Sequence, residues 1–171
     1  MKTKRILKIM NILAWIAFIG LSIKAGAILI SYFISLRNEE AAKDLYEGMN
    51  LIAYKQHSLL QYSIIVGYRI IQFSVQAYIA FLVLKLLSTL NIERPFNANA
   101  LKRMQTISYC LLGLWALVVI HNIHVGILEA NSGIIAELLP SEFVYIAGIV
   151  YVFSLLFKRG LELQSENDLM I

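Results

Sequence analysis

The chain has 171 residues, of which 59% are hydrophobic and only 15% are charged, and its mean hydropathy is +0.70. A soluble domain carries about 25% charged residues, so this composition excludes a globular domain with a polar shell. The net charge of +4 needs no nucleic-acid partner, because basic residues are attracted to the anionic inner leaflet of a membrane. A single cysteine, Cys110, excludes an intramolecular disulfide.

Four apolar segments follow one another along the chain, and each is predicted to cross a bilayer as a helix. A hydrocarbon core about 30 Å thick requires roughly 20 residues of helix. The predicted spans are residues 9–36, 63–87, 107–128 and 143–157. The basic start resembles a signal peptide, but the apolar stretch continues beyond the usual length, so we interpret it as a retained helix. The predicted fold is an all-α integral membrane protein with four transmembrane helices, forming one domain over residues 1–171.

The connections between the spans carry their own signals. The first connection has about 26 residues and begins with an acidic, alanine-containing stretch that predicts a short amphipathic helix, with Ile52, Leu59 and Leu60 as apolar anchors. In the second connection, Asn97 is predicted to cap the next helix, because its side chain accepts from first-turn N–H groups.

The distribution of basic residues predicts the orientation, because lysine and arginine are enriched in connections that stay in the cytoplasm. With the N-terminus inside, ten basic residues are cytoplasmic and four are outside. The ten are Lys2, Lys4, Arg5, Lys8, Lys85, Arg94, Lys102, Arg103, Lys158 and Arg159, and the four are Arg37, Lys43, Lys55 and Arg69. Both termini are therefore predicted to be cytoplasmic, and the first connection lies outside.

Polar side chains inside the spans are the candidate functional residues, because such groups are costly in lipid. The set comprises Lys24, Arg69, Gln72, Gln76, His121 and His124. Arg69, Gln72 and Gln76 lie at i, i+3 and i+7, which places them on one helix face. Two interpretations stay open. The groups either hydrogen-bond across helices and hold the bundle together, or line an outward-open pocket for an acidic, peptide or lipid ligand.

Catalysis and metal binding have little support in the sequence. His121 and His124 are one helical turn apart, but structural zinc needs four ligands and no cysteine lies near them. The chain has no glycine-rich phosphate loop, no nucleophile with a recognisable base and no carboxylate pair within a span. We therefore predict no enzyme activity, no cofactor and no metal site.

Two segments on the predicted cytoplasmic side resemble a known family. "RPFNANALKRM" follows the second span, and "FKRGLELQSENDLMI" ends the chain. Together they are similar to the paired signatures of a bacterial membrane family of unknown function, domain of unknown function 2975. The tail matches at Phe157, Lys158, Gly160, Glu162, Leu163, Gln164, Glu166, Asp168, Leu169 and Ile171. The resemblance implies a four-helix protein of the bacterial cytoplasmic membrane, commonly encoded beside a small helix-turn-helix DNA-binding protein, and it brings no established activity.

Gly160 either lets the last helix continue through residues 158–171 or breaks it. For the tail itself, two interpretations stay open. The tail docks on the basic "ALKRM" segment of its own chain, or the two form a platform for a cytosolic partner. The predicted partner-binding residues are Arg94, Phe96, Lys102, Arg103, Leu161, Glu162, Glu166, Asp168 and Leu169.

The predicted function is a membrane regulator that senses an external or membrane signal and binds a small DNA-binding regulator. The alternative is a small transporter, channel or bacteriocin-immunity protein that uses the outer polar pocket. The predicted partners are the lipid bilayer and the helix-turn-helix protein, with no direct contact to nucleic acid, and a homo-oligomer stays open.

Overall fold

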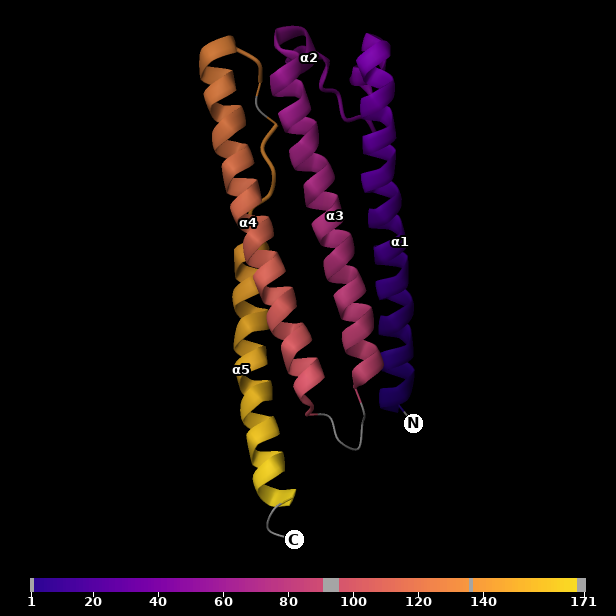
Figure 1. Cartoon of the computed structure of the whole chain (residues 1–171), viewed down its shortest axis with the longest axis vertical. Helices are drawn as coiled ribbons and strands as arrows, with labels where there is room; N and C mark the ends of the chain where they lie inside the picture. The colour runs from indigo at the N-terminus through magenta and orange to yellow at the C-terminus, as the bar shows by residue number, and fades with distance from the viewer. Residues whose placement is uncertain (1, 91–95, 136, 169–171) are drawn as a thin grey trace. The chain divides into compact units, whose positions relative to one another are not determined.

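The computed structural model describes residues 2–90, 96–135 and 137–168, and the regular elements in these ranges are all helices (Figure 1). In chain order they are α1 (Lys2–Arg37), the 3₁₀ helix η1 (Glu39–Lys43), α2 (Ile52–His57), α3 (Leu59–Thr89), α4 (Ala98–Ser132) and α5 (Phe143–Asp168). No strand occurs in this part of the chain. The all-α prediction is confirmed.

The four long helices are long and apolar enough to cross a membrane. Each predicted span lies inside one of them, and every helix is longer than the span predicted within it. The difference is largest for α4, and α5 continues without interruption to Asp168, 11 residues beyond its predicted end. Four such helices indicate a multi-pass membrane protein. Its orientation in the bilayer remains a prediction.

The helix ends follow local chemistry. The Asn97 Oδ1 accepts a hydrogen bond from the Ala100 N–H at 2.8 Å, which confirms the predicted cap of α4. At the other end of α4, Gly133 has a φ of +70° and its N–H donates to the Glu129 carbonyl at 2.8 Å. A left-handed residue just after a helix is commonly glycine, because a side chain is disfavoured there.

The chain divides into two compact units. The cap unit consists of Ile19–Ala77 and Ala116–Ser141, and the tail unit consists of Met1–Phe18, Tyr78–Trp115 and Glu142–Ile171. The apolar core of the cap unit combines residues from α1, the first connection, α3 and α4. Its fully buried members include Ile28, Leu45, Leu51, Tyr62 and Ile65. In the tail unit, Leu82, Ile107, Leu111 and Ala147 bring together α3, α4 and α5.

The first connection packs into the core of the cap unit through apolar residues, among which Ile52 was predicted. Leu45, Leu51 and Tyr54 are buried, whereas Leu59 and Leu60 are exposed and begin α3. The Leu51 N–H donates to the Ala42 carbonyl at 2.8 Å, which ties the start of α2 back to η1. The connection contains two short helices, η1 and α2, where the sequence predicted one.

Candidate functional site

A group of polar side chains is buried in the cap unit, with Arg69 of α3 at its centre. The Arg69 side chain is only 7% exposed, and its Nη2 lies 3.0 Å from Oε2 of Glu137, which is 60% exposed. Gln72, one turn further along α3, and His121 of α4 are also buried. His121 packs on the ring of Tyr68, the residue that precedes Arg69 on α3. We call Arg69, Gln72, His121, His124 and Glu137 the polar cluster.

Both histidines of the polar cluster pack against one aromatic ring. The ring of Tyr68 meets His121 edge-on, with centroids 5.4 Å apart, and meets His124 at 5.9 Å. His124 Nε2 is 2.7 Å from Gln61 Oε1, and His121 Nδ1 is 3.2 Å from Asn122 Oδ1. No group of three or more metal-ligating side chains is clustered among the described residues. The histidines thus join α4 to α3 through an aromatic ring and an amide.

Lys24 and Gln76, the remaining members of the predicted pocket, have different surroundings. Lys24 Nζ is 2.9 Å from Glu47 Oε2 and lies over the rings of Tyr46 and Phe73, at 5.3 Å and 4.8 Å from their centroids. It therefore joins α1 to the first connection and α3. Gln76 is half-buried on α3. The structure thus brings Arg69, Gln72, His121 and His124 together, and places Lys24 in a separate contact.

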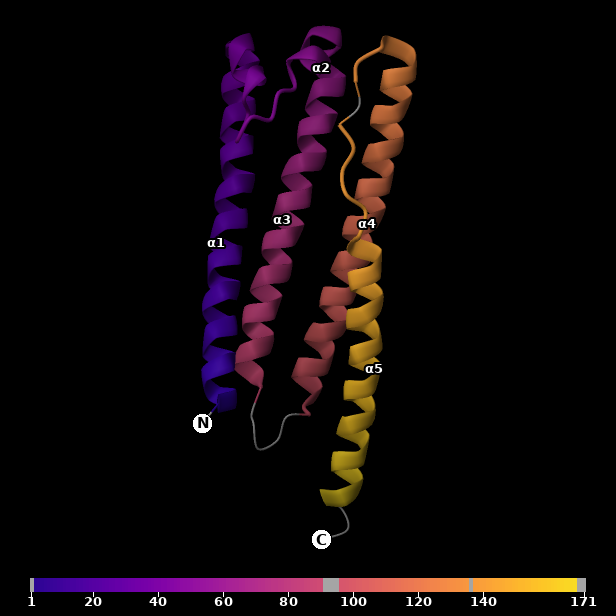
Figure 2. The same ribbon diagram turned by 180° about the vertical axis from the view of Figure 1, so that it is seen from behind.

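The segment that carries Glu137 is fastened on both sides of it. This return segment, residues 133–135 and 137–141, follows α4 and turns back along it (Figures 1 and 2). On one side, the Tyr54 hydroxyl donates to the Ile135 carbonyl at 3.3 Å. On the other, Asn122 accepts from the Leu139 N–H at 2.8 Å and donates to the Leu139 carbonyl at 2.9 Å. Burial raises the pKa of Tyr54, so its phenol keeps the proton that it donates.

Several buried polar atoms of the cluster have no hydrogen-bond partner among the described residues. They are Arg69 Nε, Gln72 Oε1, His121 Nε2 and His124 Nδ1. Buried polar groups in folded proteins are nearly always paired with protein or water. Four unpaired atoms in one cluster therefore indicate a place where a further polar group can bind.

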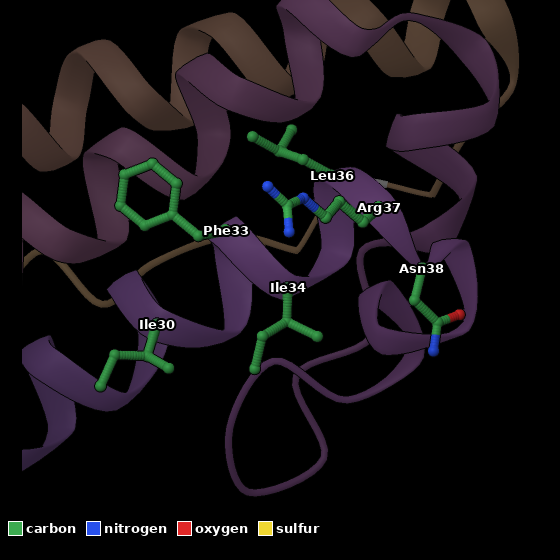
Figure 3. A pocket seen from close by; sticks show the side chains of 6 residues that line it. All are labelled: Ile30, Phe33, Ile34, Leu36, Arg37 and Asn38. Atoms are coloured by element: carbon green, nitrogen blue, oxygen red, sulfur yellow. The ribbon is translucent and has the colours of Figure 1, made fainter.

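Two surface grooves lie away from the polar cluster, and each is lined by a single helix end or face. One, of about 630 Å³, is lined by Ile30, Phe33, Ile34, Leu36, Arg37 and Asn38 (Figure 3). Figure 3 shows the Arg37 guanidinium extending back along α1 among these apolar side chains. The other, of about 480 Å³, is lined by Val144, Tyr145, Gly148, Ile149, Val152 and Phe153 of α5. Apolar faces of candidate spans are expected to contact lipid tails.

In the tail unit, Phe96 joins the start of α4 to the polar end of α5. Its ring meets the ring of Phe157 edge-on, with centroids 5.0 Å apart. A Cβ atom at Gly160 would lie 2.5 Å from Cε1 of Phe96, so only glycine admits the ring this closely. Gln164 Nε2 also donates to the Phe96 carbonyl at 3.4 Å. Gly160 lies inside α5 and does not break it.

The other residues predicted to bind a partner are only partly brought together. Glu162 pairs with Arg159 of its own helix at 3.0 Å. Lys102 and Glu166 are exposed, while Leu161 and Arg103 are half-buried. The Arg103 Nη1 is buried and unpaired within the described part of the chain. Arg94, Leu169 and the side chain of Asp168 lie outside the described residues.

One known protein family matches most of the chain. The family described as "Protein of unknown function (DUF2975)" matches residues 41–171. The chain belongs to this family. The match covers both segments on which the resemblance was based. No curated protein and no solved structure matches this chain.

The candidate site of this DUF2975 protein includes residues that the sequence did not single out. Glu137, Asn122, Gln61 and Tyr68 contact the predicted residues. Gln61 lies eight residues before Arg69 on α3, so the helical spacing that indicated Arg69, Gln72 and Gln76 could also have indicated Gln61. Glu137 and Asn122 lie outside α3, so no spacing along that helix indicates them. The sequence did contain one indication that Glu137 pairs with Arg69. A buried arginine requires an anion, and the connection before α5 contains glutamates and no basic residue.

Proposed function

We propose that this DUF2975 protein is a membrane-embedded regulatory protein. The polar cluster of the cap unit responds to a ligand or membrane signal, and the tail of α5 binds or releases a small cytosolic DNA-binding regulator. Such a response requires the signal to favour one conformation of the protein over another. Helices α1, α3 and α4 contribute residues to both units, so they are the elements that would carry the change.

The observation that carries the proposal is the continuation of α5 through the polar residues after Phe157. Its 26 residues make a helix about 39 Å long at 1.5 Å per residue, which exceeds the roughly 30 Å of hydrocarbon. The excess falls on the polar residues after Phe157 if the apolar start lies in lipid. Under the predicted orientation, these residues form an ordered helix in the cytoplasm.

The surface of this helix suits a protein partner. Leu163 is 47% exposed, and Glu166 lies beside it on the exposed surface. Phe96 contacts this helix near the start of its polar part, at Gly160. An exposed leucine with acidic neighbours on a fixed helix is a suitable surface for a basic protein that has an apolar contact of its own.

The test is recovery of the partner by tagged, detergent-solubilised protein from native cells, followed by direct binding of the two purified proteins. The variant replaces Glu162 and Glu166 with Gln and Asp168 with Asn. The control replaces Glu39 and Glu40 of η1 with Gln, in the cap unit. Membrane abundance of each protein is measured in parallel.

We expect the native and control proteins to bind a small DNA-binding protein and the tail variant to lose it at equal abundance. Equal binding by all three would remove the tail from the proposal. Absence of any DNA-binding partner would overturn the regulatory function and favour the transporter, channel or immunity alternative, to be followed by transport assays.

A further inference from the structure

We infer that Arg69 is the centre of a binding site for a carboxylate group on an apolar molecule, and that Glu137 occupies this site in the absence of that molecule. The inference rests on the proposed function and deepens it, because it names the ligand class and the internal competitor at the polar cluster. Its steps are the state of Arg69, the unpaired atoms beside it, and the way in which Glu137 reaches it.

Arg69 needs an anion at its position in the cap unit. A guanidinium does not lose its charge in proteins, and a buried charge without a counter-ion is strongly destabilising. The Arg69 side chain is 7% exposed, and its one ion pair in the described structure is with Glu137. A planar guanidinium can bind a carboxylate through two parallel N–H groups. In the structure, Nη2 of Arg69 pairs with Glu137, while Nε of Arg69 has no partner among the described residues.

The groups beside Arg69 offer more polar atoms than Glu137 pairs with. Gln72 is 5% exposed and its Oε1 is unpaired, and His121 is 1% exposed with Nε2 unpaired. A carboxylate bound to both Nη2 and Nε of Arg69 would pair the Nε atom that Glu137 leaves free. His121 Nε2 is a further atom at which a ligand oxygen or hydroxyl can bind.

Glu137 is replaceable without unfolding the return segment. Its side chain is 60% exposed, so one face of the Arg69 ion pair is open to the outside of the unit. The backbone on either side is fixed separately, at Ile135 by Tyr54 and at Leu139 by Asn122. A competing carboxylate therefore has to displace only the Glu137 side chain.

The residues beside Glu137 indicate what the competing molecule is like. Ile135 is 83% exposed and Leu138 is 64% exposed, so the built-in carboxylate is flanked by exposed apolar side chains. Ile134 of the same segment packs against the apolar core of the cap unit. An anionic ligand that takes the place of Glu137 meets the same mixture, and a carboxylate on an apolar body matches it. Fatty acids and the C-termini of short apolar peptides both have this chemistry.

The experiment measures equilibrium binding to the intact chain in phosphatidylcholine nanodiscs, with empty nanodiscs subtracted. The probes are decanoate and trileucine with an acetylated N-terminus, called trileucine below, and their neutral counterparts are decanol and the C-terminal amide of the same acetylated peptide. The variants are Glu137→Gln, which removes the competing charge but keeps an amide, and Glu129→Gln, which removes an exposed carboxylate from α4 in the same unit. A third variant, Arg69→Gln with Glu137→Gln, removes both charges and leaves no unpaired ion.

We expect Glu137→Gln to bind at least one acidic probe about tenfold more tightly than the native protein does, a coupling of ordinary size between competing groups. Glu129→Gln should bind the probes with the affinity of the native protein, and the doubly substituted protein should bind neither acidic probe. The affinity for each neutral counterpart should be the same in all variants. Preference for decanoate identifies a lipid-derived acid, and preference for trileucine identifies a peptide terminus.

Equal binding of decanoate and decanol, equal affinity of Glu137→Gln and Glu129→Gln, or no binding of either acidic probe would each overturn the inference. Glu137→Gln keeps the test decisive if the doubly substituted protein does not fold. The readout needs no DNA-binding partner. Failure of the site is therefore distinguishable from failure of the proposed function, which is measured at the tail.

Discussion

The cap unit and the tail unit use different chemistry to hold their helices together. In the cap unit, polar side chains join the elements, as in Ser35 with Tyr62 at 2.6 Å and Tyr32 with Ser63 at 2.9 Å. In the tail unit, aromatic rings and close packing dominate, as in Phe96 with Phe157 and Phe18 with Phe81, whose centroids are 5.8 Å apart.

The difference also appears in the buried polar atoms that have no partner. Among the described residues, four buried side-chain polar atoms without a partner belong to the cap unit. One such atom, Arg103 Nη1, belongs to the tail unit. Unpaired polar atoms are costly to maintain for stability alone. The difference therefore supports placing the proposed ligand site in the cap unit and the proposed docking surface in the tail unit.

The largest expected effect in the cap unit comes from releasing the return segment. Asn122→Ala removes both hydrogen bonds to the buried backbone of Leu139, and we expect a loss of about 2–4 kcal/mol because two polar groups become unpaired. Hydrogen exchange of residues 137–141 should accelerate. Asn131→Ala, an exposed amide near the end of the same helix, is the control and should leave exchange unchanged. Unchanged protection in Asn122→Ala would show that the segment is held in another way.

The tail unit is tested at Gly160. Gly160→Ala places a methyl group against the Phe96 ring, and overpacking of this kind costs about 1–3 kcal/mol. We expect faster hydrogen exchange of residues 158–168. In the Phe96→Ala background, the same substitution should stop being harmful, because alanine favours helix by about 1 kcal/mol over glycine.

The control for Gly160 is Gly148, in the same helix. A Cβ atom there meets nothing within 4 Å, so Gly148→Ala should be tolerated. A double-mutant cycle with no coupling between Phe96 and Gly160 would contradict the proposed close packing. Equal damage from both glycine substitutions would indicate a general requirement for flexibility in α5.

The smallest expected effect comes from a single interhelical hydrogen bond. Tyr62→Phe removes the bond between α3 and Ser35 of α1, and we expect a loss of about 1 kcal/mol because the Ser35 hydroxyl still bonds the Tyr32 carbonyl at 2.7 Å. Thermal unfolding in detergent measures it. Tyr145→Phe, at a side chain that is 74% exposed, should leave the melting temperature unchanged. Similar melting of both variants would mean that the cap unit depends less on its polar contacts than the comparison implies.

Local patterns were sufficient wherever one short stretch of chain decides the outcome. The four apolar segments predicted four long helices, and Asn97 predicted the start of α4. The paired segments around Phe96 and Phe157 predicted the family. The end of α5 was not predictable in this way, because Gly160 is a weak helix former that alone suggests a break.

The composition of the cluster was partly predictable. The cost of polar groups in lipid indicated Arg69, Gln72 and the two histidines, and the structure brings these four together. Lys24 carries the same signal, yet it pairs with Glu47 of the first connection. Which polar groups meet depends on the rotation of each helix and the path of each connection, and neither is visible in a spacing of three or four residues.

The sequence by itself determined that this protein consists of helices suited to a membrane, because length and apolarity are properties of each segment alone. Only the tertiary structure decided that Glu137 pairs with Arg69 and that Phe96 fills the space left by Gly160. These contacts join residues more than sixty positions apart. Packing selects such partners by shape and charge in three dimensions, after the helices have formed.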